Sequence, residues 1–288
     1  MDKLSNIGTI KEILTRHGFS FSKTLGQNFL INPIVCPRIA ELGNAAPGWG
    51  ILEIGTGIGV LTVELSKRAD KVVAVEIDTR LMPVLAETLQ ECNNVKIINQ
   101  DILQVDLQQL LREEFPDQPV AVCANLPYYI TSPILMHLLE SRLPIRSITV
   151  MVQKEAAERI CALPGTRSVG AISIAVRYFS EPKLLFHVSR GSFMPSPNVD
   201  SCVIRLDIRE QTPADVQDET FFFQLVRAAF SQRRKTLINP VSAVLQLPKQ
   251  QVADAVAAAG LKPTVRAEEL QMEQFIALSN LLGPQRAT

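Results

Sequence analysis

The stretch CANLPYYITSPI, residues 123–134, follows an apolar run typical of a buried strand and combines residue types that bind flat polar groups. The side chain of Asn125 offers an amide oxygen as a hydrogen-bond acceptor. The carbonyl of Leu126 is a second acceptor, and it precedes Pro127, which has no N–H to donate. Tyr128 adds an aromatic face directly after the proline. Acceptors beside an aromatic ring at a strand end indicate a binding site rather than a simple turn.

A second candidate site is the segment LEIGTGIG, in which Gly55, Gly57 and Gly59 lie between an expected strand and an expected helix. Glycines at such a turn allow a tight bend and a close approach of a ligand to the backbone. Glu76, at the end of the next expected strand, supplies a carboxylate that can reach the ribose hydroxyls of an adenosine-bearing cofactor. A purely structural turn and a solvated strand-end charge are the alternatives.

Two classes of cofactor fit this turn. A nicotinamide site normally has the spacing GxGxxG and a pyrophosphate at the helix N-terminus. This chain has GxGxG, with Glu53 two residues before the first glycine. A carboxylate there repels pyrophosphate but attracts the ammonium and sulfonium groups of S-adenosylmethionine, which favours the methyl donor. Asp101 is placed to accept a hydrogen bond from an adenine amino group, or alternatively only caps the following helix.

The elements that must position these residues follow from apolar periodicity. Short apolar runs alternate with helical patterns, which predicts an α/β fold with a parallel sheet. The expected strands cover residues 50–55, 71–77, 94–99, 119–126 and 145–153. Two extended segments within residues 182–208 are expected to add antiparallel strands at the sheet edge.

The apolar pattern changes after the sheet. Residues 209–219, REQTPADVQDE, have no apolar periodicity and predict a linker. We therefore expect a cofactor-binding domain over residues 1–208. A small all-helical domain is expected over residues 220–288.

The expected helical domain contains a local excess of positive charge. Residues 222–266 hold seven basic residues and one acid, Asp254. The basic residues are Arg227, Arg233, Arg234, Lys235, Lys249, Lys262 and Arg266. Such a cluster can bind nucleic-acid phosphates, although a solvated face is the alternative.

A single helix is predicted over residues 220–237, with Arg227, Arg234 and Lys235 on one broad face because of their spacing. Pro240 is expected to break this helix near Ile238 or Asn239, since proline removes a donor from the helical ladder.

Composition limits the classes of protein to which the chain can belong. The chain has 288 residues, 47% of them hydrophobic, and its 29 basic residues balance 29 acidic ones. Five cysteines without a CxxC pair and three histidines without ligand spacing predict a reduced interior and no metal. No apolar run approaches the roughly 18 residues of a membrane span. A cytoplasmic protein without membrane partners is expected.

The motifs together resemble the ribosomal RNA adenine dimethyltransferases. The resemblance rests on LGQNFL (25–30), LEIGTGIGVLT (52–62), VEID (75–78), NQDIL (99–103), NLPYYI (125–130), VQKE (152–155) and FMPSPNVDS (193–201). Among these, NLPY and LGQNFL are far more specific than a glycine motif. The resemblance implies a Rossmann-like methyltransferase sheet, mostly parallel with an antiparallel edge strand. It also implies S-adenosylmethionine as cofactor and a catalytic role for the domain over residues 1–208.

Residue roles also follow from the resemblance, position by position. It implies cofactor contacts from Asn28, Leu30, Gly55, Glu76, Asp101 and Asn125. It implies a catalytic motif of Asn125, Leu126, Pro127 and Tyr128, completed by Phe193. A flap over the cofactor is implied at Lys23, Gln27 and Asn28.

The chemistry of the motif agrees with these roles. An adenine N6 amine is a poor nucleophile because its lone pair is delocalised into the ring. Acceptors at Asn125 and Leu126 would favour a pyramidal nitrogen whose lone pair points at the methyl donor. Pro127 restricts the conformation of the preceding carbonyl. Tyr128 would stack on the base and Phe193 would close its other face, although ordinary core packing is the alternative for Phe193.

Within the family, the chain is most similar to bacterial enzymes that dimethylate two adjacent adenosines near the 3′ end of small-subunit (16S) ribosomal RNA. The expected partner is that RNA within an assembling 30S particle, bound by a monomer. One alternative is a macrolide-resistance-type methyltransferase of large-subunit ribosomal RNA, which the longer C-terminal domain disfavours. A mainly non-enzymatic assembly factor is the other, and a DNA adenine methyltransferase fits the motif less well.

Overall fold

The computed structural model describes residues 4, 6–22, 27–213 and 215–283. The chain divides into two compact units. The first comprises Met1–Ala157 and Glu181–Ile208, and the second comprises Glu158–Ser180 and Arg209–Thr288. Residues 158–180, which we expected in the first domain, therefore group with the C-terminal residues.

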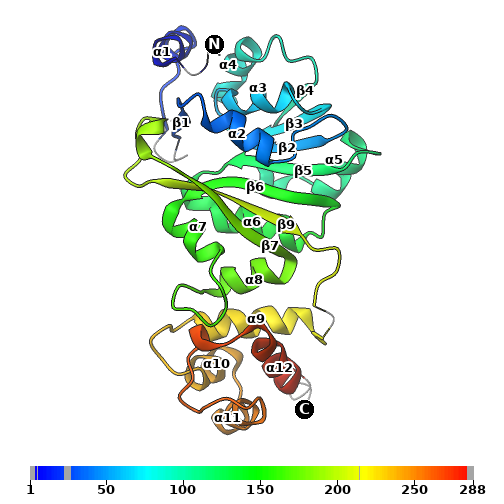
Figure 1. The fold of residues 1–288 in the computed structure, drawn as a ribbon, viewed down its shortest axis with the longest axis vertical. Helices are drawn as coiled ribbons and strands as arrows, with labels where there is room; N and C mark the ends of the chain where they lie inside the picture. Colours follow the sequence, from blue (N-terminus) through cyan, green and yellow to red (C-terminus); the bar gives the residue numbers. More distant parts are fainter. Residues whose placement is uncertain (1–3, 5, 23–26, 214, 284–288) are drawn as a thin grey trace. The chain divides into compact units, whose positions relative to one another are not determined.

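A seven-stranded sheet forms the centre of the first unit (Figure 1). Its strand order is β4-β3-β2-β5-β6-β9-β7. The strands are β2 (Gly50–Ile54), β3 (Lys71–Glu76), β4 (Val95–Asn99), β5 (Val120–Asn125), β6 (Ile145–Gln153), β7 (Ser180–Val188) and β9 (Ser201–Ile208). The first five in this order pair in parallel, and β9 pairs antiparallel with β6. The predicted parallel sheet with an antiparallel edge is confirmed.

Strand register brings three chain turns to one edge of the sheet. Ile54 pairs with both Val75 and Ala124, so the residues that follow these three positions leave the sheet together. Strands β2 and β5 are apolar and almost fully buried, as expected for parallel strands covered on both faces. Ligands of open α/β sheets bind at the carboxyl ends of the strands.

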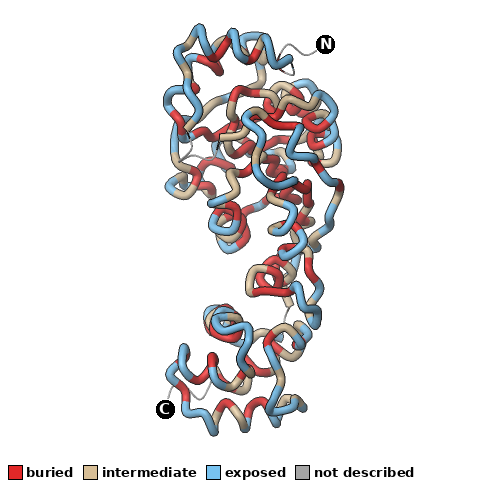
Figure 2. Tube along the Cα trace, turned by 90° about the vertical axis from the view of Figure 1, so that its left-hand side faces the viewer, coloured by how far each residue is buried: buried red, intermediate tan, exposed pale blue. Residues whose placement is uncertain are grey.

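Helices cover both faces of this sheet, with α2 and α3 on one face and α5 and α6 on the other (Figure 1). The helices of the unit are α1 (Ile7–Arg16), α2 (Val35–Leu42), α3 (Val60–Ser66), α4 (Met82–Thr88), α5 (Leu107–Glu114) and α6 (Thr131–Glu140). Helix α7 (Lys154–Ile160) spans the boundary between the units. Figure 2 shows buried residues running through the sheet region.

Short elements complete the first unit near the ends of the strands. They are the 3-10 turns η2 (Thr79–Leu81), η3 (Ile102–Gln104), η4 (Tyr128–Ile130) and η5 (Arg190–Ser192). A two-stranded antiparallel sheet joins β1 (Phe29–Leu30) to β8 (Phe193–Met194). In its register Leu30 pairs with Phe193, which places a segment from the N-terminal region beside one from the late loop.

The second unit is helical. It contains α8 (Ala171–Phe179), α9 (Glu219–Phe230), α10 (Ile238–Leu245), α11 (Lys249–Ala258), η6 (Ala267–Glu269) and α12 (Met272–Leu282). Aromatic rings join its first two helices, since Tyr178 lies 5.3 Å from Phe222 between ring centroids. The Tyr178 hydroxyl also donates to Glu219 Oε2 at 2.8 Å. A buried phenol thus keeps a hydrogen-bond partner within an apolar cluster.

The predicted helix over residues 220–237 is wrong at its C-terminal end, because α9 ends at Phe230. The Ser231 hydroxyl donates to the Ala228 carbonyl at 2.7 Å, and turns follow over residues 231–234. Arg227 therefore does not share a helical face with Arg234 and Lys235. The Arg233 guanidinium donates to the carbonyls of Arg167 and Val169, so a contact far away in sequence holds this turn.

The predicted helix break near Ile238 is also wrong, because α10 begins at that residue. Pro240 lies in the first turn of α10, where a backbone N–H has no intrahelical acceptor. The proline therefore costs no hydrogen bond, and it lies inside the first turn of a helix rather than at the end of one.

Two absences hold for the described part of the chain. None of its helices is both long enough and apolar enough to cross a membrane. None of its residues form a group of three or more histidine, cysteine or acidic side chains able to hold a metal ion.

Candidate functional site

A pocket lies at the carboxyl ends of β2, β3, β4 and β5 and holds about 890 Å³ of space, part of it open to solvent. Nine of the ten predicted site residues line it. They are Asn28, Gly55, Glu76, Asp101, Asn125, Leu126, Pro127, Tyr128 and Phe193. Leu30 is buried and instead borders a smaller hollow beneath the glycine turn, together with Glu53 and Asn125.

The glycine turn has the backbone that its sequence predicts. Gly55 has φ +76° and lies beside Asn125, whose carbonyl oxygen is 3.8 Å from the place of a Cβ. Gly59 has φ +88°, and a Cβ there would meet Leu89 Cδ2 at 2.9 Å. Both positions require a left-handed conformation that glycine adopts without cost. The first lets the backbone border the pocket, and the second allows close packing of the following helix start.

Glu76 is a buried carboxylate held by backbone N–H groups, not the solvated charge that was the alternative. Gly57 N–H donates to its Oε2 at 3.0 Å, and Asp78 N–H donates to its Oε1 at 2.9 Å. Burial raises the pKa of Glu76, while these two hydrogen bonds lower it. Each carboxylate oxygen keeps a second lone pair, so the group is fixed in place and can still accept from two ribose hydroxyls.

Glu53 was expected to be a charged carboxylate near the glycine turn, but its surroundings favour the neutral form. Its side chain is fully buried beneath the turn, and neither carboxylate oxygen makes a hydrogen bond within the described residues. The pKa of Glu53 is raised to about 8, mainly by burial and to a smaller extent by the nearby Glu76 carboxylate, while Thr62 acts in the opposite direction. The carboxyl is therefore mostly protonated at neutral pH, and a buried polar group without partners faces the hollow beside Gly55 and Asn125. A cationic group entering there would favour its ionised form.

Asp101 is both a cap of the following turn and a residue of the pocket, the two roles that the sequence allowed. Its Oδ1 accepts from the Leu103 N–H at 3.0 Å, which makes it the N-cap of η3. The residue also lines the pocket, beside Gln100 and Ile102. The cap fixes the side chain and leaves its other oxygen available for a ligand.

The four residues from Asn125 to Tyr128 line the same pocket. Leu126 is 1% exposed, and its N–H donates to the Met151 carbonyl at 3.2 Å. Pro127 has φ −58° and ψ 132°, and it caps the turn η4. Within the described residues no hydrogen bond occupies the Asn125 side chain or the Leu126 carbonyl. Two acceptors with unused lone pairs thus belong to residues that line the pocket.

Aromatic rings border the same space. Tyr128 is half-buried, and burial raises the pKa of its phenol. Phe193 is 3% exposed and belongs to the hydrophobic core, as its alternative interpretation held, but it also lines the pocket. Both residues are therefore placed to contact one flat ligand.

Some pocket features were not assigned from the sequence. Ile77 lines the pocket with 51% of its surface exposed, and its signal was an apolar residue directly after a strand-end acid. Ser201 is the last residue of the motif FMPSPNVDS, and the sequence predicted no role for it. In the structure its hydroxyl contacts the Tyr128 hydroxyl. The predicted flap residue Lys23 lies outside the described residues, whereas Gln27 and Asn28 line the pocket.

Comparison with known proteins connects this geometry to a family. The model of the family described as "Ribosomal RNA adenine dimethylase" matches residues 18–283. The chain belongs to the ribosomal RNA adenine dimethylase family. The predicted family is confirmed, and the match covers both compact units.

Relatives of the same family show how similar the chain is to named proteins. It is 51% identical over 280 residues to "Ribosomal RNA small subunit methyltransferase A" of Anoxybacillus flavithermus, covering 95% of this chain and 94% of the relative. The protein of the same name from Geobacillus thermodenitrificans is 50% identical over 283 residues, with 96% of each chain covered.

Solved structures of similar fold confirm the predicted methyltransferase architecture. A dimethyladenosine transferase from Plasmodium falciparum has a TM-score of 0.69 and 26% identity, covering 90% of this chain and 98% of that one. The 23S rRNA methyltransferase ErmE has a TM-score of 0.66 and 28% identity, covering 89% and 100%. The fold is thus shared with a dimethyladenosine transferase and with a 23S rRNA methyltransferase, and sequence identity is higher to the two small-subunit methyltransferases.

Proposed function

We propose that this chain transfers methyl groups from S-adenosylmethionine to the N6 amines of two adjacent adenosines near the 3′ end of small-subunit ribosomal RNA. The product is N6,N6-dimethyladenosine. The observation that carries the proposal is that Glu76, Asn125 and Tyr128 all line one pocket. The chain is also 50–51% identical to two proteins named ribosomal RNA small subunit methyltransferase A. The large-subunit alternative is not favoured, because ErmE is only 28% identical.

The residues of the pocket fit S-adenosylmethionine. The fixed carboxylate of Glu76 would accept from the ribose hydroxyls, and Asp101 would accept from the adenine amino group. Gly55 and the unpaired, buried Glu53 adjoin the hollow where cationic groups of the cofactor would lie. Asn28 and Leu30 would contact the cofactor from the N-terminal side. When bound, the cofactor supplies an electrophilic methyl group on a sulfonium.

The chain's own contribution to catalysis is the orientation of the target amine. The side-chain oxygen of Asn125 and the carbonyl of Leu126 would accept its two N–H groups, which pyramidalises the nitrogen and aims its lone pair. Pro127 disfavours a helical conformation at the preceding residue and so restricts the position of the Leu126 carbonyl. Alignment of nitrogen and methyl group removes an entropic cost. No base is needed before the attack, because the neutral amine attacks through its lone pair and loses its proton only after the N–C bond has formed and S-adenosylhomocysteine has left.

The target base would lie between two aromatic side chains. Tyr128 would stack on one face of the adenine and Phe193 would close the other. Since an adenine paired inside a helix cannot reach such a pocket, the base must come from unpaired RNA or leave its stack.

RNA binding outside the pocket falls to exposed basic residues of the second unit. Arg227, Arg234, Lys235 and Lys249 are all exposed there. Cationic side chains on a separate surface bind phosphates without reading bases, which leaves base choice to the pocket. The proposed partner is an assembling 30S particle bound by a monomer in the cytoplasm. We propose residues 1–208 as the catalytic domain, of which residues 158–180 group with the C-terminal unit, 209–219 as a linker and 220–288 as the RNA-binding domain.

The test is to incubate the protein with isotopically labelled S-adenosylmethionine and unmethylated small subunits, large subunits or duplex DNA. Mapping of the label should give N6,N6-dimethyladenosine at two neighbouring positions near the 3′ end of the small-subunit RNA. Label confined to large-subunit RNA or to DNA would overturn the proposal.

A further inference from the structure

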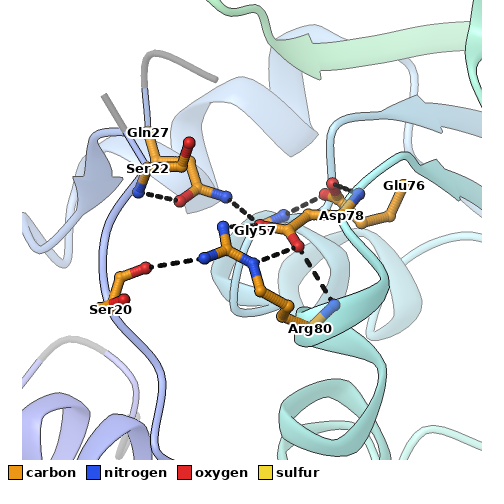
Figure 3. A network of polar contacts seen from close by, with 7 residues as sticks. All are labelled: Ser20, Ser22, Gln27, Gly57, Glu76, Asp78 and Arg80. Carbon is orange, nitrogen blue, oxygen red and sulfur yellow. Dashed lines mark hydrogen bonds and ion pairs between the residues drawn. The ribbon is translucent and has the colours of Figure 1, made fainter. Parts of the chain in front are cut away.

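Asp78 is a buried acid, 6% exposed, that contacts residues on two sides of the pocket (Figure 3). It is not among the described residues that line the pocket. Its neighbours do line it, with Glu76 and Ile77 on one side and Gln27 and Asn28 on the other. Asp78 can therefore affect a ligand in the pocket only through the neighbouring residues that line it.

The side chain of Asp78 holds the N-terminal side. Its Oδ2 accepts from Gln27 Nε2 at 2.7 Å. Gln27 Oε1 in turn accepts from the Ser22 N–H at 2.9 Å, and Gln27 N–H donates to the Ser22 carbonyl at 3.4 Å. The Gln27 amide is therefore used at both ends, so its orientation is fixed. Asn28, the next residue, enters the pocket from this anchored position.

The backbone of Asp78 holds the other side. Its N–H donates to Glu76 Oε1 at 2.9 Å, one of the two bonds that fix the carboxylate proposed to bind ribose. One residue thus sets both the position of Glu76 and, through Gln27, the position of Asn28. The link joins segments 51 residues apart in sequence.

Arg80 fixes the Asp78 carboxylate itself. Its Nε donates to Oδ1 at 2.8 Å and its Nη2 to Oδ2 at 2.6 Å, a two-point contact that sets the plane of the carboxylate. Arg80 Nη1 also donates to the Ser20 carbonyl at 3.3 Å, and the guanidinium lies 5.1 Å from the Phe19 ring centroid. The pair therefore reaches residues 19–22 as well as Gln27.

We propose that Asp78 is a positioning residue that ties the Gln27–Asn28 segment to the Glu76 loop and thereby retains S-adenosylmethionine in the pocket. The inference rests on the proposed function, because it assumes that Asn28 and Glu76 contact this cofactor. Loss of the tie frees the Asn28 side of the pocket but leaves Asn125 and Tyr128 in place. Cofactor affinity should fall, whereas the rate of methyl transfer with the cofactor bound should not.

The experiment compares the parent with Gln27→Ala, Asp78→Asn and the double variant. Isothermal titration with S-adenosylmethionine and with S-adenosylhomocysteine gives the dissociation constants, and steady-state kinetics give KM and kcat. Each single variant should raise the dissociation constant roughly tenfold, as loss of one charge-assisted hydrogen bond does. The dissociation constant of the double variant should be no higher than that of the more impaired single variant, because both substitutions remove the same link. KM for the cofactor should rise with kcat near the parental value.

Asp207→Asn is the matched control. Asp207 also pairs with an arginine two residues away, since Arg205 Nε lies 2.7 Å from its Oδ1, but it is on β9 away from the pocket. This variant should keep the parental dissociation constant. Hydrogen exchange at the Ser22 amide, without ligand, should become faster in Gln27→Ala and Asp78→Asn only.

Three results would overturn the inference. Parental affinity in both Gln27→Ala and Asp78→Asn would show that the tie does not retain the cofactor, while the proposed function would stand. An equal loss of affinity in Asp207→Asn would show a general effect of stability. Failure of the parent protein itself to bind S-adenosylmethionine would overturn the proposed function together with the inference.

Discussion

The hydroxyl of Ser201 lies 2.7 Å from the hydroxyl of Tyr128, a contact between residues 73 positions apart. Ser201 is fully buried at the start of β9, where it pairs with Gln153 of β6. Tyr128 lies at the pocket. The first residue of β9 therefore holds the hydroxyl end of the ring on which the target adenine is proposed to stack.

Removal of this hydrogen bond should weaken methyl transfer modestly. Ser201→Ala and Tyr128→Phe should each lower kcat/KM for the RNA about fivefold, because one hydrogen bond contributes about 1 kcal/mol. The double variant should be no worse than either single one. Kinetics on small subunits measure this. Ser147→Ala, which also removes a buried serine hydroxyl that accepts from Asn44, should lower stability but not kcat/KM. Equal kinetic losses in Ser147→Ala and Ser201→Ala would contradict the prediction.

Glu53 should make the stability of the free protein depend on pH. Its pKa in the folded chain is about 8 against an ordinary value of 4.5. Between these values the folded state binds more protons than the unfolded state, so the free energy of unfolding falls as pH rises through this window. The loss attributable to Glu53 should be on the order of a few kcal/mol.

Urea unfolding of the parent and of Glu53→Gln at pH 5, 6.5 and 8 measures this contribution. The glutamine variant cannot ionise, so its stability should fall less between pH 5 and pH 8. The same decrease in both proteins would show that Glu53 does not titrate in this range.

The turn after α9 carries three exposed basic residues, Arg233, Arg234 and Lys235. Of these, Arg233 donates to the carbonyls of Arg167 and Val169 at 3.0 and 3.1 Å. Charge reversal at Arg234 and Lys235 should weaken binding to small subunits. It should also make the plot of log affinity against log salt less steep, by about one for each RNA phosphate that the variant no longer neutralises.

Arg233→Ala should act mainly on folding of the second unit, lowering its melting temperature. Binding titrations at several salt concentrations and thermal unfolding separate the two effects. Lys11→Glu, at an exposed position on α1, is the control for added negative charge. A loss of RNA affinity in Lys11→Glu equal to that in the Arg234 and Lys235 variant would show a non-specific charge effect.

Local sequence was enough to predict the sheet and most of the predicted pocket residues, whereas Asn28 and Phe193 were predicted only from the resemblance to the family. Apolar strands are short and bounded by turn residues, and a parallel sheet must collect its strand ends at one edge. Glu76 and Asn125 could therefore be recognised as strand-end polar residues. The Asp101 cap was likewise visible, because a cap depends on residues two or three positions away.

Contacts between distant segments were not predictable in this way. The end of α9 at Phe230 is set together with Arg233, whose acceptors are 64 and 66 residues away. The protonated state of Glu53 follows from burial beneath the turn, and its spacing from the glycines says nothing of that depth. Ser201 and Asp78 act through partners that only the fold brings near.

The most direct test of the account is the single-turnover rate of methyl transfer by Asn125→Ala to unmethylated small subunits, with saturating S-adenosylmethionine. Asn125 is proposed to orient the amine in the transition state, and one such acceptor contributes about 10²–10³ in rate. We expect a rate lower by that factor, with the fold and RNA affinity retained. A parental rate in Asn125→Ala would contradict this expectation.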